Sequence, residues 1–380
     1  MNKLNFSTLC IHAGEEYKPD IIPPIHMSTT YLWYGEEQEY VYSRVDNQTR
    51  KALESKMTIL ECGKASLAFS SGMAAIATVI LSLVKPGDEI IVSDDLYSGT
   101  EGLMHKLRDE YKLHVKFIDT TNPENIEREI SNRTKIIFIE TPSNPLLKIS
   151  DIKAISEVAS RYNIKLIVDS TFASPYIQKP IKLGADIVVH SATKYLGGHN
   201  DILAGIATFN SLEDYECVKY MRSRLGTPLP PFDSYLLLRS IKTLALRMER
   251  HCRNAFELSR YLLEHPKIKQ VIYPFLESHP QYDIARKQMK CGGGMISFRL
   301  RSNDPKDAKR FLTRLRIIKS AVSLGSVVSL IECPYIMTHS RLPEEERLKR
   351  GITPDLIRFS VGIEDVNDLI NDLEQALKEL

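Results

Sequence analysis

The sequence has no large excess of charge of either sign, and this absence excludes several classes of protein. Its 380 residues include 50 lysines and arginines against 48 aspartates and glutamates, which gives a formal net charge of +2. A protein whose main partner is a nucleic acid or an anionic membrane usually carries a strongly basic surface. We therefore expect neither partner.

Long hydrophobic runs are also missing. The longest apolar helix-like run, Met73 to Val84, is too short to cross a bilayer. The stretch from Met1 to Cys10 contains no apolar signal region. These two features predict a cytoplasmic protein.

Two short motifs are absent as well. The six cysteines are scattered without a Cys-x-x-Cys pair, which argues against both a disulfide framework and a zinc or other metal site. No Gly-x-Gly-x-x-Gly turn follows the first predicted strand. That absence disfavours a nucleotide-binding oxidoreductase.

Apolar segments alternate with helical patterns from Ala65 to about Asn210, and each apolar segment ends in a polar or glycine-containing turn. This alternation predicts βαβ units and therefore an α/β fold with a mostly parallel sheet. Ligands bind at the carboxyl ends of the strands in such a sheet. The residues that follow each predicted strand are therefore the candidates for a functional site.

The rest of the chain predicts a second, smaller α+β unit. Three prolines near residue 230 mark a break, and Asp233 to His265 has the periodicity of one long helix that leaves the large domain. Further strands are predicted near Met295–Leu300, Ile318–Ser323 and Leu356–Val361, and further helices near Pro305–Leu315 and Glu364–Leu380. We therefore predict a proline-containing extended arm over 1–43, a large domain over 44–238 and a small domain over 239–380.

Lys194 is the most suggestive residue at a strand end. It follows the apolar run 187–189, and the hydroxyls of Ser191 and Thr193 precede it. An ordinary lysine amine has a pKa of about 10.4, so freeing it for chemistry at neutral pH costs roughly 4 to 5 kcal/mol unless burial, a cation or an imine removes that cost. On this stretch alone, a lysine that simply reaches solvent is as plausible as a catalytic one.

Four other strand ends carry groups that complement an amine. Ser71-Gly72-Met73 opens a helix whose free N–H groups suit a phosphate, and Tyr97 offers a flat face for an aromatic ligand. Asn144 either donates into the site or satisfies its own turn, and Asp169 is either a cap or the counter-charge of a ligand cation. A phosphate site, an aromatic surface, a fixed negative charge and an amine together predict binding of pyridoxal 5'-phosphate.

The sequence resembles the pyridoxal-phosphate enzymes of cysteine and methionine metabolism over nearly its whole length. This family includes cystathionine γ-synthase, cystathionine β- and γ-lyases, methionine γ-lyase and homoserine sulfhydrylases. The motifs that carry the resemblance are Tyr42-Ser43-Arg44, Ser70-Ser71-Gly72-Met73, Asp95-Leu96-Tyr97, Glu140-Thr141-Pro142-Ser143-Asn144-Pro145, Asp169-Ser170-Thr171, the stretch from His190 to His199, Ser323-Leu324-Gly325 and Arg358-Phe359-Ser360-Val361-Gly362.

The resemblance implies an aspartate-aminotransferase-like fold of fold type I, and it implies a role for each motif. Lys194 is expected to bind the cofactor as an imine, Asp169 to pair with the ring nitrogen and Tyr97 to stack on the ring and act as an acid. The residues expected at the phosphate are Ser71, Gly72, Met73, Ser191 and Thr193, together with Tyr42 and Arg44 of a partner subunit. Asn144, Ser323 and Arg358 are expected to bind the substrate α-carboxylate.

The resemblance further implies a homotetramer built as a dimer of dimers, with active sites shared between two subunits. Such sharing explains an arm that has too little apolar periodicity to form a core. Without the resemblance, Tyr42-Ser43-Arg44 is weak evidence, because phenols and a guanidinium are common on any polar surface.

The expected activity is γ-elimination on cystathionine, which yields cysteine, 2-oxobutanoate and ammonia. The alternatives are γ-replacement by a cystathionine γ-synthase or O-acylhomoserine sulfhydrylase, and methionine γ-lyase activity. Val322 stands where γ-synthases and many γ-lyases of the family have glutamate, and Gly99 stands where methionine γ-lyases have cysteine. Val328 and Gln48 also depart from the family pattern, and no mechanistic reason for either change is evident. An inactive relative that serves as a binding protein is disfavoured, because every residue needed for imine chemistry is present.

Overall fold

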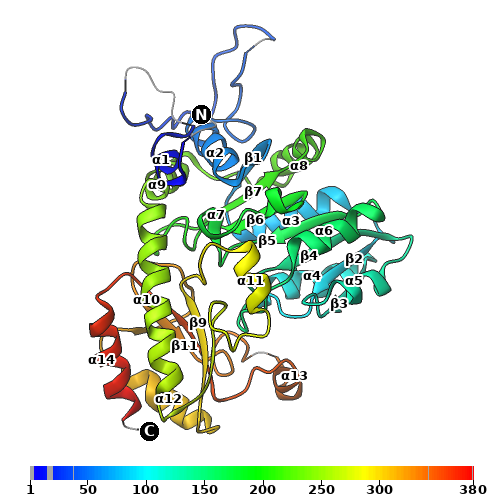
Figure 1. Ribbon diagram of the computed structural model, residues 1–380. Helices are drawn as coiled ribbons and strands as arrows, with labels where there is room; N and C mark the ends of the chain where they lie inside the picture. The colour runs from blue at the N-terminus through cyan, green and yellow to red at the C-terminus, as the bar shows by residue number, and fades with distance from the viewer. Residues whose placement is uncertain (1–3, 15–19, 37, 341, 379) are drawn as a thin grey trace.

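The structure, a computed structural model, describes residues 4–14, 20–36, 38–340, 342–378 and 380. Two sheets organise it (Figure 1). The first sheet has seven strands in the order β1-β7-β6-β5-β4-β2-β3, and the second has five in the order β10-β11-β12-β9-β8. None of the helices in the described parts of the chain has the length and apolarity needed to cross a bilayer.

The first sheet is almost entirely parallel, as predicted. Only β7 runs antiparallel to its neighbours β1 and β6. The central strands of this sheet are rich in buried Ile and Val, because helices cover both faces of the sheet. The strands are β1 (Ala65–Phe69), β2 (Glu89–Ser93), β3 (His114–Ile118), β4 (Thr134–Glu140), β5 (Lys165–Asp169), β6 (Ile187–Ser191) and β7 (Gly205–Phe209).

The helices associated with this sheet precede its first strand, separate consecutive strands or follow the last one. They are α2 (Gln48–Glu61), α3 (Gly72–Leu83), α4 (Ser98–Tyr111), α5 (Pro123–Glu129), α6 (Ile152–Arg161), α7 (Ser174–Ile177), the 3-10 helix η1 (Pro180–Leu183) and α8 (Leu212–Leu225). Several begin with a polar cap of the expected kind. Ser71, for example, accepts a hydrogen bond from Ala74 N at 3.0 Å at the start of α3.

The second sheet is antiparallel except for the β10–β11 pair. Its strands are β8 (Ile268–Ile272), β9 (Met295–Leu300), β10 (Lys319–Ser320), β11 (Leu330–Glu332) and β12 (Leu356–Ser360). The helices of this part are α11 (Tyr282–Gln288), α12 (Pro305–Arg314), α13 (Glu344–Lys349) and α14 (Val366–Leu377). The strand predicted over Ile318–Ser323 was wrong in extent, because Ser323 adopts a positive φ of 82° and the backbone leaves the sheet after Ser320.

The prediction of a single long helix over Asp233–His265 is also wrong. The structure has two helices, α9 (Pro231–Ile241) and α10 (Leu244–Glu264), with a break at Lys242 and Thr243. Next to the break, the buried guanidinium of Arg247 donates a hydrogen bond to the Ser240 carbonyl at 3.0 Å. Figure 1 shows α10 running beside the second sheet from α9 toward the C-terminus.

The arm predicted as wholly extended begins with a helix, α1 (Phe6–His12). Phe6, Leu9 and Cys10 share one face of this helix and pack against the core, and Lys56 donates to the Cys10 carbonyl at 2.6 Å. Residues 1–3, 15–19 and 37 of the predicted arm lie outside the described residues. The described remainder, from 20 onward, loops away from the body at the top of Figure 1.

One buried histidine makes stability depend on pH. His251 of α10 is fully buried, its Nδ1 lies 2.7 Å from the Val361 carbonyl, and burial lowers its pKa to about 4. Because the unfolded chain binds a proton there near pH 6.5 and the folded chain does not, stability falls as pH drops from 6.5 toward 4. We expect His251→Met to remove about 2 kcal/mol of the difference in unfolding free energy between pH 7 and pH 5. Urea unfolding of the wild type and the variant at the two pH values measures this difference. If it is the same in both proteins, groups other than His251 cause the pH dependence of stability.

Candidate active site

A cavity of about 500 Å³ lies at the carboxyl ends of the strands of the first sheet and is closed on one side by Arg358 of β12 and by residues 322–324 of the loop after β10. Eleven of the thirteen predicted site residues line it, and only Tyr42 and Arg44 do not. The eleven are Ser71, Gly72, Met73, Tyr97, Asn144, Asp169, Ser191, Thr193, Lys194, Ser323 and Arg358.

Lys194 lies in the turn after β6, and its amine projects toward the second sheet. Its Nζ donates to Ser323 Oγ at 2.8 Å. Burial, together with the positive charge of Arg358, lowers the pKa of Lys194 to about 8, although Glu332 opposes the shift. At pH 7 about a tenth of such an amine is neutral, against well under a thousandth for an ordinary lysine. The environment therefore favours a nucleophilic or basic amine.

This lowered pKa predicts how the cofactor-free protein reacts with an aldehyde. Only the neutral amine attacks a carbonyl, so the rate of reconstitution with pyridoxal 5'-phosphate should rise with pH and level off above about 8. Stopped-flow absorbance across pH 6 to 10 measures this profile. A midpoint near the pKa of a free lysine would show that the cavity does not lower the pKa of the Lys194 amine.

Asp169 ends β5 and faces the cavity beside a second buried carboxyl, Glu140. Burial raises the pKa of Asp169, while hydrogen bonds from Thr171 N (3.0 Å) and Thr171 Oγ1 (2.5 Å) oppose the rise. Burial and the neighbouring Asp169 raise the pKa of Glu140 well above its ordinary value. A cationic ring nitrogen next to Asp169 would supply the positive charge that this carboxyl lacks.

The opposite end of the cavity suits an anion. Gly72 and Met73 begin α3, whose first amide groups have no partner within the helix. The helix approaches β6 so closely that a Cβ on Gly72 would lie 2.8 Å from Ser191 Cβ, which explains the glycine. Ser191 and Thr193 place two hydroxyls at the same cavity. This is the donor set that a phosphate requires.

Arg358 is held at the side of the cavity formed by the second sheet. It is 3 % exposed and donates to Asn144 Oδ1 at 2.9 Å and to the Ser323 carbonyl at 3.0 Å. Its Nη2 also lies 3.1 Å from Glu332 Oε1, and its Nε has no hydrogen-bond partner among the described residues. The guanidinium is therefore rigidly placed and keeps an unused donor, which suits a substrate carboxylate.

Tyr97 stands at the start of α4 with its side chain 45 % exposed, and its backbone N–H donates to Glu140 Oε2 at 2.9 Å. Gly99 lies against the ring: a Cβ there would be 2.5 Å from Tyr97 Cε1. A larger residue at position 99 would therefore displace the tyrosine ring from this place.

Tyr42 and Arg44 are at the surface instead. Tyr42 is 38 % exposed, and Arg44 donates to the Ser223 carbonyl at 2.9 Å, with its guanidinium 5.4 Å from the Tyr42 ring centre. Within one chain, these two residues form no part of the cavity.

Sequence reasoning missed several residues of the cavity. Thr338 was not singled out, and Glu140 was noted only as part of a motif. Glu332, the buried ion-pair partner of the lining residue Arg358, was also missed. A signal for Glu332 existed, because an acid that ends the short apolar run Leu330-Ile331 resembles the strand-end aspartate that was recognised. The aromatic and apolar lining residues Phe172 and Leu203 carry no such signal.

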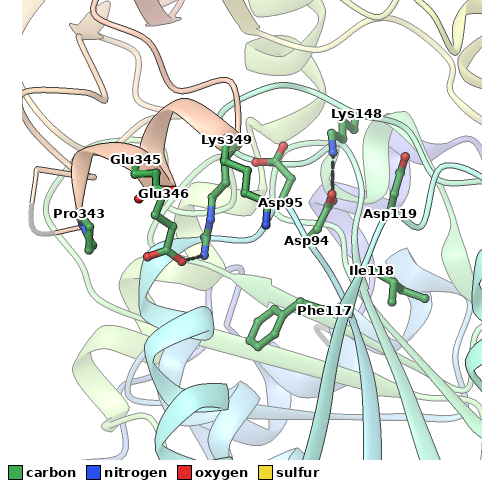
Figure 2. A pocket seen from close by; sticks show the side chains of 11 residues that line it. Asp94, Asp95, Phe117, Ile118, Asp119, Lys148, Pro343, Glu345, Glu346 and Lys349 are labelled. Carbon is green, nitrogen blue, oxygen red and sulfur yellow. Dashed lines mark hydrogen bonds and ion pairs between the residues drawn. The ribbon is translucent and has the colours of Figure 1, made fainter.

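A second cavity of about 600 Å³ lies between the ends of β2 and β3 and helix α13 (Figure 2). Two ion pairs lie in it, Lys148 Nζ 3.0 Å from Asp94 Oδ1 and Arg350 with Glu346. Among the described residues, no cluster of three or more His, Cys, Asp or Glu side chains is suited to a metal ion. Burial acts to lower the pKa of Lys148 in this cavity, but the bond to Asp94 and the nearby carboxylates together outweigh burial and raise this pKa, in contrast to the lowered pKa of Lys194.

Comparison with known proteins identifies the chain's family. Residues 7–378 match the family model described as Cys/Met metabolism PLP-dependent enzyme. The chain is 47% identical to a cystathionine beta-lyase of Coxiella burnetii over 99% of this chain and 98% of the relative. It is 44% identical to an L-methionine gamma-lyase of Pseudomonas deceptionensis, again over 99% and 98%.

A solved structure agrees with these matches. The cystathionine gamma-lyase of Lactobacillus plantarum, complexed with L-serine, superposes with a TM-score of 0.95 at 40% identity, and the match covers 99% of both chains. The fold is therefore the predicted fold type I. The chain belongs to the Cys/Met metabolism PLP-dependent enzyme family, and it is a lyase that uses pyridoxal 5'-phosphate.

Proposed function

We propose that this enzyme catalyses γ-elimination of cystathionine, in which cystathionine and water give cysteine, 2-oxobutanoate and ammonia. The observation that carries the proposal is the placement of Lys194. Its partly neutral amine lines the same cavity as Arg358 and Asp169 and lies within hydrogen-bond distance of Ser323. A base in this position is what proton removal from an amino acid requires.

The residues present fit the cofactor. Pyridoxal 5'-phosphate, when bound, supplies an electron-accepting ring that stabilises negative charge on the substrate. Lys194 would hold its aldehyde carbon, and Asp169 would keep the ring nitrogen protonated. The phosphate would be held by the start of α3, at Ser71, Gly72 and Met73, together with the hydroxyls of Ser191 and Thr193, while Tyr97 would lie against the ring.

The protein's own groups then perform the proton transfers. Arg358, Asn144 and Ser323 bind the α-carboxylate and so orient the Cα–H bond toward Lys194. The neutral Lys194 amine would remove the Cα proton and pass it to the former aldehyde carbon of the cofactor, and, neutral again, would then remove a Cβ proton. The Tyr97 hydroxyl donates a proton to the sulfur as it leaves Cγ.

We also propose that Tyr42 and Arg44 bind the phosphate of a partner subunit's site, in a homotetramer built from two dimers. In support, both side chains are exposed at the surface, outside their own chain's cavity. The preceding arm exposes apolar side chains, including Ile21 (95 %) and Tyr34 (82 %), which would be buried against a second copy.

β-Elimination of the same compound is the second candidate, because a relative 47% identical to the chain is named cystathionine beta-lyase. The two reactions differ in which half of cystathionine lies in the carboxylate pocket. Methionine as the preferred substrate is less well supported, since Gly99 gives Tyr97 a position that a larger residue would alter.

Product analysis tests the proposal. We expect purified enzyme to convert L-cystathionine into 2-oxobutanoate and cysteine in equal amounts. Pyruvate and homocysteine instead would establish β-elimination. The enzyme could instead form cystathionine from an O-acylhomoserine and cysteine while releasing no 2-oxobutanoate from cystathionine. That result would establish γ-replacement and overturn the proposed γ-elimination.

Val322 predicts a specific change in substrate affinity. It is 54 % exposed and lines the cavity beside Ser323. Introducing a carboxylate by Val322→Glu should lower KM for cystathionine about fivefold, because a partly exposed ion pair with the distal ammonium contributes up to about 1 kcal/mol. The neutral Val322→Gln variant is the control, and methionine, which has no distal ammonium, should show no such gain. Equal effects of the two substitutions would exclude the charge as the cause.

A further inference from the structure

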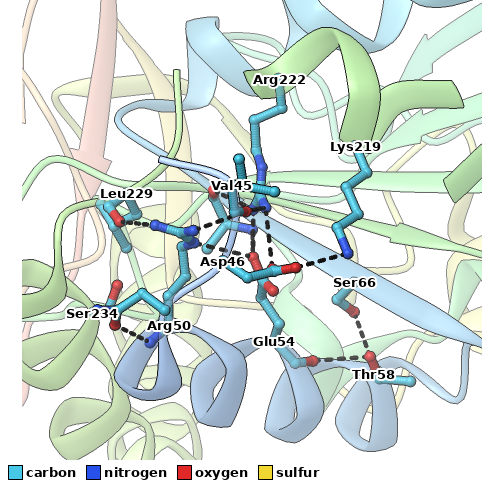
Figure 3. A network of polar contacts seen from close by, with 12 residues as sticks. Val45, Asp46, Arg50, Glu54, Thr58, Ser66, Lys219, Arg222, Leu229 and Ser234 are labelled. Carbon is cyan, nitrogen blue, oxygen red and sulfur yellow. Dashed lines mark hydrogen bonds and ion pairs between the residues drawn. The ribbon is translucent and has the colours of Figure 1, made fainter. Parts of the chain in front are cut away.

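Three fully buried charged side chains, Arg50, Glu54 and Arg222, form a polar network that contacts Val45, the residue after Arg44 (Figure 3). Arg50 is 1 % exposed, Glu54 4 % and Arg222 0 %. Burying three charges has a large desolvation cost, and an apolar cluster of the same size would often be as stable. The contacts of these side chains therefore indicate what the network does.

The first set of contacts fixes the backbone on both sides of Arg44. Arg50 Nη2 donates to the Ser43 carbonyl at 2.8 Å and to the Val45 carbonyl at 3.1 Å. Arg222 Nη2 donates to the same Val45 carbonyl at 3.2 Å. Two rigid guanidinium groups thus hold the carbonyls that flank Arg44 and leave its own side chain at the surface.

The second set of contacts fixes strand β1. Glu54 Oε1 accepts a hydrogen bond from Ala68 N at 2.9 Å and also binds Arg222. Arg222 Nη1 in turn donates to the Ala68 carbonyl at 3.2 Å. Ala68 is three residues before Ser71, which caps α3 at the anion end of the cavity. The same ion pair therefore contacts both the segment around Arg44 and the strand that leads into the phosphate turn.

We propose that Arg50, Glu54 and Arg222 are positioning residues for the cofactor phosphate in two active sites at once. They hold Tyr42 and Arg44 in place for the partner subunit's site, and they hold the phosphate turn of their own chain. This inference rests on the shared dimeric site of the proposed function.

The geometry explains why a rigid network is needed there. The segment 42–46 belongs to no helix or strand, and its regular backbone pairing is limited to contacts such as Ser43 N with the Thr29 carbonyl at 2.8 Å. Moving a phosphate-binding group by about 1 Å can reduce function on the order of 100-fold. Paired guanidinium and carboxylate groups give directional contacts that an apolar cluster does not.

Cofactor binding to the Glu54→Gln enzyme tests the proposal. Glutamine keeps an acceptor for Ala68 N but removes the carboxylate that binds Arg222, which is then paired only with Asp46 at 4.0 Å. We expect the dissociation constant for pyridoxal 5'-phosphate to rise about 10- to 100-fold. The dissociation constant for pyridoxal, which lacks the phosphate, should not change. A merely structural role would weaken both ligands alike, and an unchanged ratio of the two affinities would overturn the proposal.

Thr58→Val is the matched control. Thr58 is on the same helix, and its Oγ1 contacts Ser66 Oγ at 2.9 Å, so the substitution also breaks a polar contact between α2 and β1. Thr58→Val should leave the affinities for pyridoxal 5'-phosphate and for pyridoxal unchanged. If it changed their ratio as much as Glu54→Gln does, the proposal would be contradicted. If Glu54→Gln does not fold, Arg50→Lys retains the charge without the planar fork and should change the same ratio in the same direction.

Mixed dimers separate the two halves of the proposal, with the visible absorption of lysine-bound cofactor as the readout. Pairing a Glu54→Gln, Lys194→Ala chain with a wild-type chain leaves one lysine site, whose partner segment alone is altered. Pairing Glu54→Gln with Lys194→Ala alters only the site's own phosphate turn. We expect weaker binding in both than in wild type paired with Lys194→Ala. Weakening in only one of them would show that the network serves one site.

Arg44→Ala distinguishes failure of this inference from failure of the shared site. If Arg44→Ala binds pyridoxal 5'-phosphate as the wild type does, the shared site itself is wrong. If Arg44→Ala weakens binding and Glu54→Gln does not, the shared site stands and the positioning role of the network is wrong.

Discussion

Replacing Lys194 with alanine should lower the rate of 2-oxobutanoate formation from cystathionine by about 10⁴-fold or more, because it removes the base from the reaction. The cofactor's aldehyde should also lose its covalent attachment, so the visible band of lysine-bound cofactor should disappear. Lys194→Arg should behave in the same way, since a guanidinium keeps its proton at neutral pH.

The structure also predicts that this loss is not caused by misfolding. Burial lowers the Lys194 pKa to about 8, so the charged amine destabilises the folded, cofactor-free protein at pH 7. The cofactor-free Lys194→Ala protein should therefore be as stable as the wild type or more stable, by up to about 3 kcal/mol. Denaturant unfolding measures this difference.

Lys148→Ala is a matched control for the activity measurement. Lys148 is also a partly buried lysine beyond a strand end, but it is paired with Asp94 and lies outside the active-site cavity. It should retain most of the activity. Retention of appreciable activity by Lys194→Ala would remove the basis of the proposed mechanism.

The first sheet was predictable because its sequence signals are local. Buried β-branched runs followed by polar turns specify parallel strands, and the topology of such a sheet brings their ends together. Ser71, Tyr97, Asn144, Asp169 and Lys194 could therefore be assigned to one cavity from the sequence alone.

The second sheet was harder to predict because its short strands depend on tertiary contacts. β10 and β11 have two and three residues, which is too short for a period-two pattern to be recognised. The sequence shows Glu332 as an acid after a short apolar run, but its partnership with Arg358 arises only when β11 pairs with β12. The break between α9 and α10 depends similarly on where the Arg247 side chain donates its hydrogen bonds.

Arg358 should have the second largest effect on activity. Arg358→Met removes the cation expected to bind the α-carboxylate, and we expect kcat/KM for cystathionine to fall about 10³-fold. The substitution also leaves Glu332 buried without its partner, which should cost about 3–5 kcal/mol in unfolding free energy. Activity assays and denaturant unfolding of the single variant measure the two losses.

A double substitution separates these two effects. In Arg358→Met/Glu332→Leu no unpaired carboxylate remains, and replacing a buried ion pair with apolar side chains is often neutral or stabilising. We therefore expect the double variant to regain most of the stability that the single variant loses, while kcat/KM stays low. Recovery of activity along with stability would show that Arg358 supports the fold at this position and does not bind the carboxylate. Persistent inactivity in a stable protein, with the Lys194 pKa unchanged in the reconstitution profile, would support a direct contact of Arg358 with the substrate carboxylate.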